Sequence, residues 1–94
     1  MSLGFPNPSR SYDPDHHRIR FWGHDSAMEV PFFLDENAIF VLYPKTGKTE
    51  AAILEAFDSA RERIMAVAAK VYALGRHHSF YVLTGDQFSQ AASA

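Results

Sequence analysis

Hydrophobic and polar residues alternate in two neighbouring stretches of the chain, residues 18–22 and 28–34. Every second side chain in each stretch is apolar, which is the period of a strand that buries one face. The residues between the two stretches include Gly23, Asp25 and Ser26, which are residue types that favour turns. The pattern therefore predicts an antiparallel hairpin.

The position of the turn sets the register of this hairpin. Folding the chain about His24 and Asp25 gives three cross-strand pairs, namely Phe21 with Met28, Ile19 with Val30, and Arg20 with Glu29. The apolar side chains then share one face, and the opposite charges pair on the other. Pro31 has no N–H to donate, so we expect the second strand to lie at an edge or to end there.

Residues 49–74 form the longest periodic segment, with apolar residues at alternating spacings of four and three. This is the period of an amphipathic helix, so we predict one long helix here. Thr49 can cap the start of this helix, and Gly75 can end it in a left-handed conformation. The apolar stripe consists of Ile53, Phe57, Ala60, Ile64, Val67, Val71 and Leu74.

The predicted helix is longer than the strands that it must cover. Its roughly 25 residues span about 38 Å, whereas a strand of six or seven residues spans about 22 Å. The end of the stripe, at Val67, Val71 and Leu74, would then be uncovered, and large apolar patches are rare on monomers. Two arrangements remove this exposure. Either Phe40, Tyr43 and the N-terminal Phe5 cover it in a monomer, or two copies pair their long helices in a homodimer.

The remaining segments complete a single α+β domain over residues 1–94. Residues 1–15 predict an extended N-terminal arm, residues 79–84 a C-terminal strand, and residues 89–94 a flexible tail. The predicted fold is a small antiparallel sheet, built from the hairpin and the C-terminal strand, with the long helix packed on one face. The predicted core contains Phe21, Met28, Val30, Phe32, Phe57, Ile64 and Val67.

Composition narrows the class of protein. Of the 94 residues, 47% are hydrophobic and none is cysteine, so we expect a substantial core without disulfides, thiolate metal sites or cysteine nucleophiles. The net charge of −2 argues against a protein built mainly to bind nucleic acid. No apolar run approaches the roughly 20 residues of a membrane span, and the chain does not begin like a signal peptide. We therefore expect a cytoplasmic protein.

Three segments carry a resemblance to a known family. They are Phe5-Pro6-Asn7-Pro8-Ser9-Arg10-Ser11-Tyr12-Asp13, Arg18-Ile19-Arg20-Phe21-Trp22-Gly23 and Leu54-Glu55-Ala56-Phe57-Asp58. Through them the chain resembles a bacterial family of unknown function, DUF1488, from about Phe5 to Leu83. The resemblance implies a small bacterial protein with a short helix at Asp35 to Tyr43, and it implies no activity. The local pattern alone leaves that segment open, because its acidic start favours a helix and Ile-Phe-Val favours a strand.

Two motifs suggest chemistry that their details argue against. Gly47-Lys48-Thr49 ends like a phosphate-binding P-loop, but Leu42 replaces the first glycine and Pro44 removes an amide from the cradle. The pairs His16-His17 and His77-His78 could form a metal site if they met across strands. Neighbours on a strand point to opposite faces, however, so each pair offers at most one ligand to a shared metal ion. We therefore expect no cofactor, no metal site and no catalytic residue.

Arginine and aromatic side chains share the outward face of the predicted hairpin. They are Arg18, Arg20, Trp22 and Phe33, with Phe80 or Tyr81 alongside. Such a face can stack single-stranded bases and contact phosphates, or it can be buried under the N-terminal segment or a partner subunit. The acidic net charge makes nucleic acid the less favoured partner. We therefore expect a non-catalytic interaction or accessory protein that binds a protein partner or a second copy, away from membranes.

Overall fold

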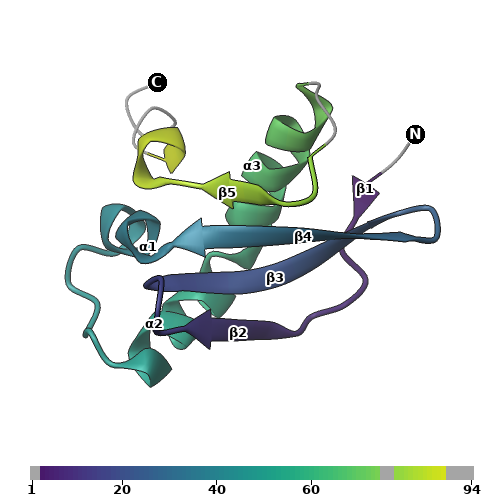
Figure 1. Ribbon diagram of the computed structural model, residues 1–94. Helices are drawn as coiled ribbons and strands as arrows, with labels where there is room; N and C mark the ends of the chain where they lie inside the picture. Colours follow the sequence, from purple (N-terminus) through teal and green to yellow (C-terminus); the bar gives the residue numbers. More distant parts are fainter. Residues whose placement is uncertain (1–2, 75–77, 89–94) are drawn as a thin grey trace.

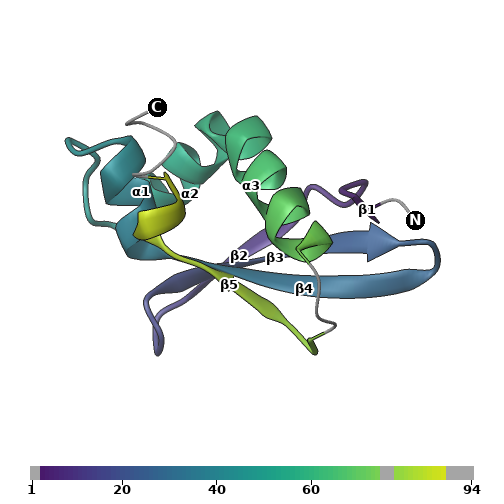
Figure 2. The same cartoon turned by 90° about the horizontal axis from the view of Figure 1, so that it is seen from above.

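The strands form one mixed sheet, and the helices pack against one face of that sheet (Figure 1; Figure 2). These elements are seen in a computed structural model, which describes residues 3–74 and 78–88. The strands are β1 (Leu3–Gly4), β2 (Arg10–Asp13), β3 (Arg18–Asp25), β4 (Met28–Asp35) and β5 (Tyr81–Leu83). The helices are α1 (Glu36–Leu42), α2 (Glu50–Ser59) and α3 (Arg61–Ala73), and residues 85–88 are also helical.

The sheet is mixed, whereas the sequence predicted an antiparallel one. β3 pairs antiparallel with β4 on one side and with β1 and β2 on the other. β5 joins β4 in the parallel direction, with Phe33 beside Val82. The connection explains the difference, because α1, α2 and α3 lie between β4 and β5 in the sequence and the chain returns to the end of the sheet at which β4 begins.

The hairpin turns at Ser26 and Ala27, two residues later than predicted, so the predicted register was wrong. Phe21 faces Phe32, which lies four residues beyond the expected Met28. A shift by an even number of residues keeps every side chain on its own face, so the apolar pattern could not reveal it. Ser26 takes a positive φ of 58°, which is typical of a tight hairpin turn.

The predicted long helix is in fact two helices, α2 and α3, which meet at Ala60. Ala60 has φ −102° and ψ 11°, close to the bridge region. Its N–H still donates to the carbonyl oxygens of Ala56 and Phe57, and its own carbonyl accepts from the N–H of Ile64. Alanine favours a continuous helix, so nothing local predicted the break. Ala60 is buried, and because the chain changes direction there, both helices remain against the sheet.

The buried face of α3 differs from the predicted stripe. Ile64, Ala68 and Tyr72 are buried, one every four residues, whereas Val67 and Val71 are only partly buried. Ile64 belongs to both rows, and beyond it the buried row runs through Ala68 and Tyr72. Because much of the stripe is covered within the chain, the geometric argument for pairing through one long helix no longer holds. The oligomeric state itself stays a prediction.

The segment that the local pattern left open is the helix α1, as the family resemblance implied. Asp35 caps it by accepting a hydrogen bond from the N–H of Asn37 at 3.2 Å, and Glu36 lies in its first turn. Ala38 and Ile39 are buried against the core. The cap and this burial outweigh the strand preference of the apolar residues.

The N-terminal arm contributes two strands to the sheet. The Arg10 side chain, on β2, donates two hydrogen bonds to the Asp58 carboxylate of α2, at 2.9 and 2.8 Å. Phe5 packs with its ring centroid 6.3 Å from that of Phe21 and 5.9 Å from that of Phe32. The arm therefore ties the first strands to α2 and closes one side of the core.

The core holds most of the residues that the sequence predicted for it. Phe21, Val30, Phe32, Phe57 and Ile64 are buried together. Two other members differ from the prediction. Val67 packs at the margin, and Met28 is 54% exposed because the true turn places it at the tip of the hairpin.

The C-terminal part of the described chain contains a core residue that the pattern did not reveal. Phe88 is fully buried, within the helical residues 85–88. The predicted strand at residues 79–84 is shorter, as β5. Gly75 and residues 89–94, predicted as a helix end and a tail, lie outside the described residues.

Candidate interaction surface

In the described part of the chain, no helix covers the sheet face opposite the helical layer (Figure 2). β3 buries Ile19 and Phe21 against the helices, so the residues that alternate with them point away. The same alternation in β4 turns Phe33 to that side. The structure thus brings the four predicted residues onto one surface. Phe80, which precedes β5, and Val82, within β5, extend this surface. We name it the open sheet face, and it consists of Arg18, Arg20, Trp22, Phe33, Phe80 and Val82.

Arg18 is held by its neighbours on this face. Its guanidinium carbon lies 3.8 Å from the centre of the Phe33 ring. Its Nε is 3.5 Å from a carboxylate oxygen of Asp13, and the register places Asp35 on the strand to its other side. The charge of Arg18 is therefore balanced locally, and its side chain orders the Phe33 ring rather than reaching into solvent.

Arg20 is the exposed cation of the open sheet face. Its guanidinium carbon lies 5.1 Å from the centre of the Trp22 ring and 6.0 Å from that of Phe33. The register places Ser11 and Phe33 beside it, so the predicted cross-strand pair with Glu29 was wrong. A guanidinium stacked on a ring can still donate hydrogen bonds from its edge to a partner.

The last strand extends the surface with apolar side chains. Phe80 meets Phe33 edge to face, with ring centroids 5.6 Å apart, and Val82 lies beside Phe33 in the register. Phe80 is 49% exposed and Val82 is 40% exposed. Tyr81, the other candidate for this position, is buried. Sequence reasoning missed Val82, although the alternation over residues 80–83 would have placed it once one neighbour was known.

Among the residues that the structure describes, the open sheet face has no excess of positive charge. By register and alternation, Asp13, Glu29 and Asp35 lie on the same side of the sheet as Arg18 and Arg20. Three carboxylates against two guanidinium groups disfavour contact with a phosphate backbone. Aromatic and arginine side chains among balanced charges are typical of surfaces that bind proteins.

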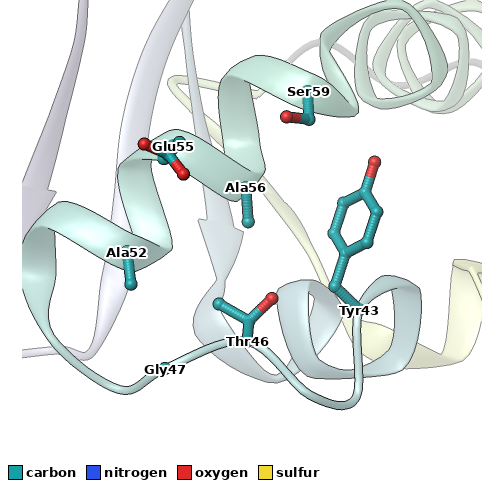
Figure 3. A pocket seen from close by; sticks show the side chains of 7 residues that line it. All are labelled: Tyr43, Thr46, Gly47, Ala52, Glu55, Ala56 and Ser59. Carbon is teal, nitrogen blue, oxygen red and sulfur yellow. The ribbon is translucent and has the colours of Figure 1, made fainter.

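A separate pocket of about 240 Å³ lies between α2 and the loop that precedes it (Figure 3). The Tyr43 side chain rises from the end of α1 with its hydroxyl group directed toward α2. Glu55 and Ser59 are exposed, so the pocket offers its carboxylate and hydroxyl groups at the surface. It is lined by Tyr43, Thr46, Gly47, Ala52, Glu55, Ala56 and Ser59. Because these polar groups remain in contact with water, they would orient a ligand only weakly.

The Gly47-Lys48-Thr49 segment is a capping loop. The Thr49 hydroxyl accepts a hydrogen bond from the N–H of Ala52 at 3.1 Å, which satisfies the start of α2. A P-loop connects a strand to a helix, but here the loop follows the helix α1. The backbone context of a phosphate cradle is therefore missing from this segment.

The first histidine pair lies in the turn between β2 and β3. Nδ1 of His16 is 2.9 Å from Oδ2 of Asp13, and Nδ1 of His17 is 3.9 Å from Oε1 of Glu36. His77, which the second pair requires, lies outside the described residues. Within the part of the chain that the structure describes, no three histidine or acidic side chains are placed to hold a metal ion.

Two tyrosines donate short hydrogen bonds to carboxylates. The Tyr12 hydroxyl donates to Oε1 of Glu36 and the Tyr72 hydroxyl to Oδ2 of Asp25, both at 2.6 Å. The hydrogen bond, with desolvation and the nearby negative charge, raises the pKa of each phenol to about 12. The second bond ties α3 to the hairpin, and the Tyr72 ring also packs against Tyr81, with centroids 5.6 Å apart.

An alkaline titration should reveal these two phenols. Since their pKa of about 12 exceeds the value of about 10 in an unfolded chain, their stabilising effect is complete below about pH 10 and is lost as the pH rises through 12. We expect Tyr12 and Tyr72 to ionise near pH 12 when phenolate absorbance is followed. Tyr12→Phe and Tyr72→Phe should each remove part of the late absorbance change. A late change of full size in both variants would contradict the assignment.

The family comparison covers the sheet and the helical layer alike. The model of a family described as a protein of unknown function, DUF1488, matches residues 3–83. This chain belongs to the DUF1488 family. The match confirms the resemblance seen in the sequence. In this DUF1488 protein the matched residues run from β1 to the last residue of β5. No curated protein and no solved structure gives a significant match.

The helices of this DUF1488 protein are short. Among the described residues, none is both long enough and apolar enough to cross a bilayer. The family description names no activity, so the surface of this chain is what bears on its function.

Proposed function

We propose that this protein is a non-catalytic interaction protein that binds a protein partner through the open sheet face. One observation carries the proposal: the helices occupy one side of the sheet, while Arg20, Trp22 and Phe80 stand on the other. Tryptophan and arginine are the residue types that most often dominate the energy of a protein interface.

The open sheet face is ordered before any partner arrives. Arg18 stacks on Phe33, and Phe80 meets the same ring from the side. The strands beneath these side chains are fixed by the core on their other face. A surface that is already ordered loses little conformational entropy on binding, which supports specific recognition.

A single-stranded nucleic acid is the alternative partner. Arg20 beside Trp22 offers a ring for stacking and a cation for one phosphate. Asp13, Glu29 and Asp35 on the same side of the sheet would repel the other phosphates. The balance of charge therefore supports the protein partner.

Affinity capture with matched variants tests this proposal. Trp22→Ser removes a ring from the open sheet face, and Tyr43→Ser removes an exposed ring beside the helices. We expect a protein captured by the wild type to bind Trp22→Ser at least about tenfold more weakly, because anchor residues contribute about 2 kcal/mol or more and a tenfold change corresponds to about 1.4 kcal/mol. Tyr43→Ser should bind as the wild type does. Circular dichroism verifies that both variants are folded.

Equal capture by the wild type and Trp22→Ser would contradict the proposal. The nucleic-acid alternative is tested with a single-stranded oligonucleotide at low and high salt. Binding that falls steeply with salt and disappears in Arg20→Ser would favour that alternative.

A further inference from the structure

Within the described residues, Arg20 is the cation of the open sheet face that has no acidic partner. The described residues include every aspartate and glutamate of the chain, and none of these carboxylates lies within ion-pair distance of the Arg20 guanidinium. Its contacts are with the rings of Trp22 and Phe33. A guanidinium beside aromatic rings keeps N–H groups at its edge for an acceptor. Arg20 is therefore available to a negatively charged group of a partner.

The two carboxylates that flank Arg18 are already engaged. Oδ2 of Asp13 lies 3.5 Å from Nε of Arg18, and the Asp35 carboxylate caps α1. In the register, Asp13, Arg18 and Asp35 lie side by side and form one row across the sheet. Arg20 belongs to the next row, between Ser11 and Phe33. The charge of Arg20 is thus not balanced within its own row.

Ser11 offers a second donor beside Arg20. The two residues lie opposite each other on β2 and β3, so their side chains leave the same face of the sheet with Cβ atoms about 4.5–5.5 Å apart. Both side chains are exposed. The hydroxyl and the guanidinium can therefore donate to the same anionic group. A carboxylate carries the single negative charge that one guanidinium balances, whereas a phosphate group carries up to two.

Apolar side chains continue from Arg20 across the face. Phe33 and Val82 follow it in the same row, and Trp22 lies beside Pro31 in the next row. Phe80 meets the Phe33 ring edge to face. An apolar side chain of a partner that covers these groups would exclude water from the adjacent ion pair. Ion pairs are stronger where water is excluded, so the apolar and charged contacts support each other.

We propose that the partner places an aspartate or glutamate on Arg20 and Ser11, and an apolar side chain beside it on Trp22. This partner chemistry rests on the proposed function and makes it more specific. Arg20 and Trp22 are two residues apart on β3, about 7 Å, so two positions of an extended segment span both contacts. A tract of several acids would also meet Asp13 and Asp35. The expected segment is therefore apolar with one acidic residue.

Selection from a library of random peptides displayed on phage tests this chemistry, with the full chain as bait. We expect the peptides that bind the wild type but not Trp22→Ser to be enriched in an aspartate or glutamate close to an apolar residue. Arg20→Glu reverses the charge of the site, so it should instead select peptides with lysine or arginine at this position. Circular dichroism verifies that each variant is folded.

A single recovered peptide gives the quantitative test by fluorescence anisotropy. Replacing its carboxylate with the corresponding amide should weaken binding to the wild type at least about tenfold, because it leaves the guanidinium without its partner. Arg20→Gln should bind the acid and amide peptides equally, as a double-mutant cycle requires for a direct pair. Lys48→Gln removes the same charge from an exposed residue before α2. It should prefer the acid peptide as strongly as the wild type does.

Two kinds of failure are distinguishable. A library that yields no peptide dependent on Trp22 would contradict the proposed function and the acidic contact together. Peptides that depend on Trp22 but carry no acidic enrichment would overturn only the acidic contact. The same conclusion would follow if Arg20→Gln kept the preference for the acid peptide, or if Lys48→Gln lost it as Arg20→Gln does.

Discussion

Replacing Phe57 with alanine is expected to lower the free energy of unfolding by about 3–5 kcal/mol. Phe57 is fully buried on α2, and its ring centroid lies 5.4 Å from that of Phe21 on β3. The substitution removes a ring from the joint between the helical layer and the sheet, and the cavity that remains can close only in part. Chemical denaturation followed by circular dichroism measures the loss.

Leu74→Ala is the matched control for this prediction. Leu74 is also a large apolar residue of the helical layer, but it is 80% exposed. Its truncation should change the free energy of unfolding by less than about 0.5 kcal/mol. A denaturation midpoint that Phe57→Ala leaves unmoved would show that α2 does not pack against β3 through this ring.

Phe88→Ala is expected to cost a similar amount, about 3–5 kcal/mol. Phe88 is fully buried although it lies five residues after the last residue of β5. Its turn is held by the N–H of Thr84, which donates to Oε1 of Gln87 at 2.6 Å. Gly85 packs against α1, where an added Cβ would lie 3.2 Å from the Val41 side chain. The turn thus seals the core beside α1.

Asp86→Ala offers a control within the same turn, since Asp86 is exposed. It should change the free energy of unfolding by less than about 0.5 kcal/mol. If Phe88→Ala unfolded at the same denaturant concentration as Asp86→Ala, the buried position of this ring would be wrong.

The composition of the candidate surface was predictable from the sequence, but its boundaries and charge balance were not. Alternation alone separates Arg18, Arg20 and Trp22 from the buried face of β3, whichever strand lies beside it. The register then decided that Arg20 faces Phe33 rather than Glu29. The arrival of β5 beside β4 added Val82, which no local pattern connects with the hairpin.

The sequence by itself determined which faces are buried and where several elements begin, because these follow from neighbours along the chain. The period of two places Phe21 and Phe32 in the core, and Thr49 marks the start of α2 through its own hydroxyl group. Only the tertiary structure decided the register, the parallel direction of β5 and the break at Ala60. Each of these depends on contacts between distant segments, such as the bond from Tyr72 to Asp25 that helps to set which side of α3 is buried.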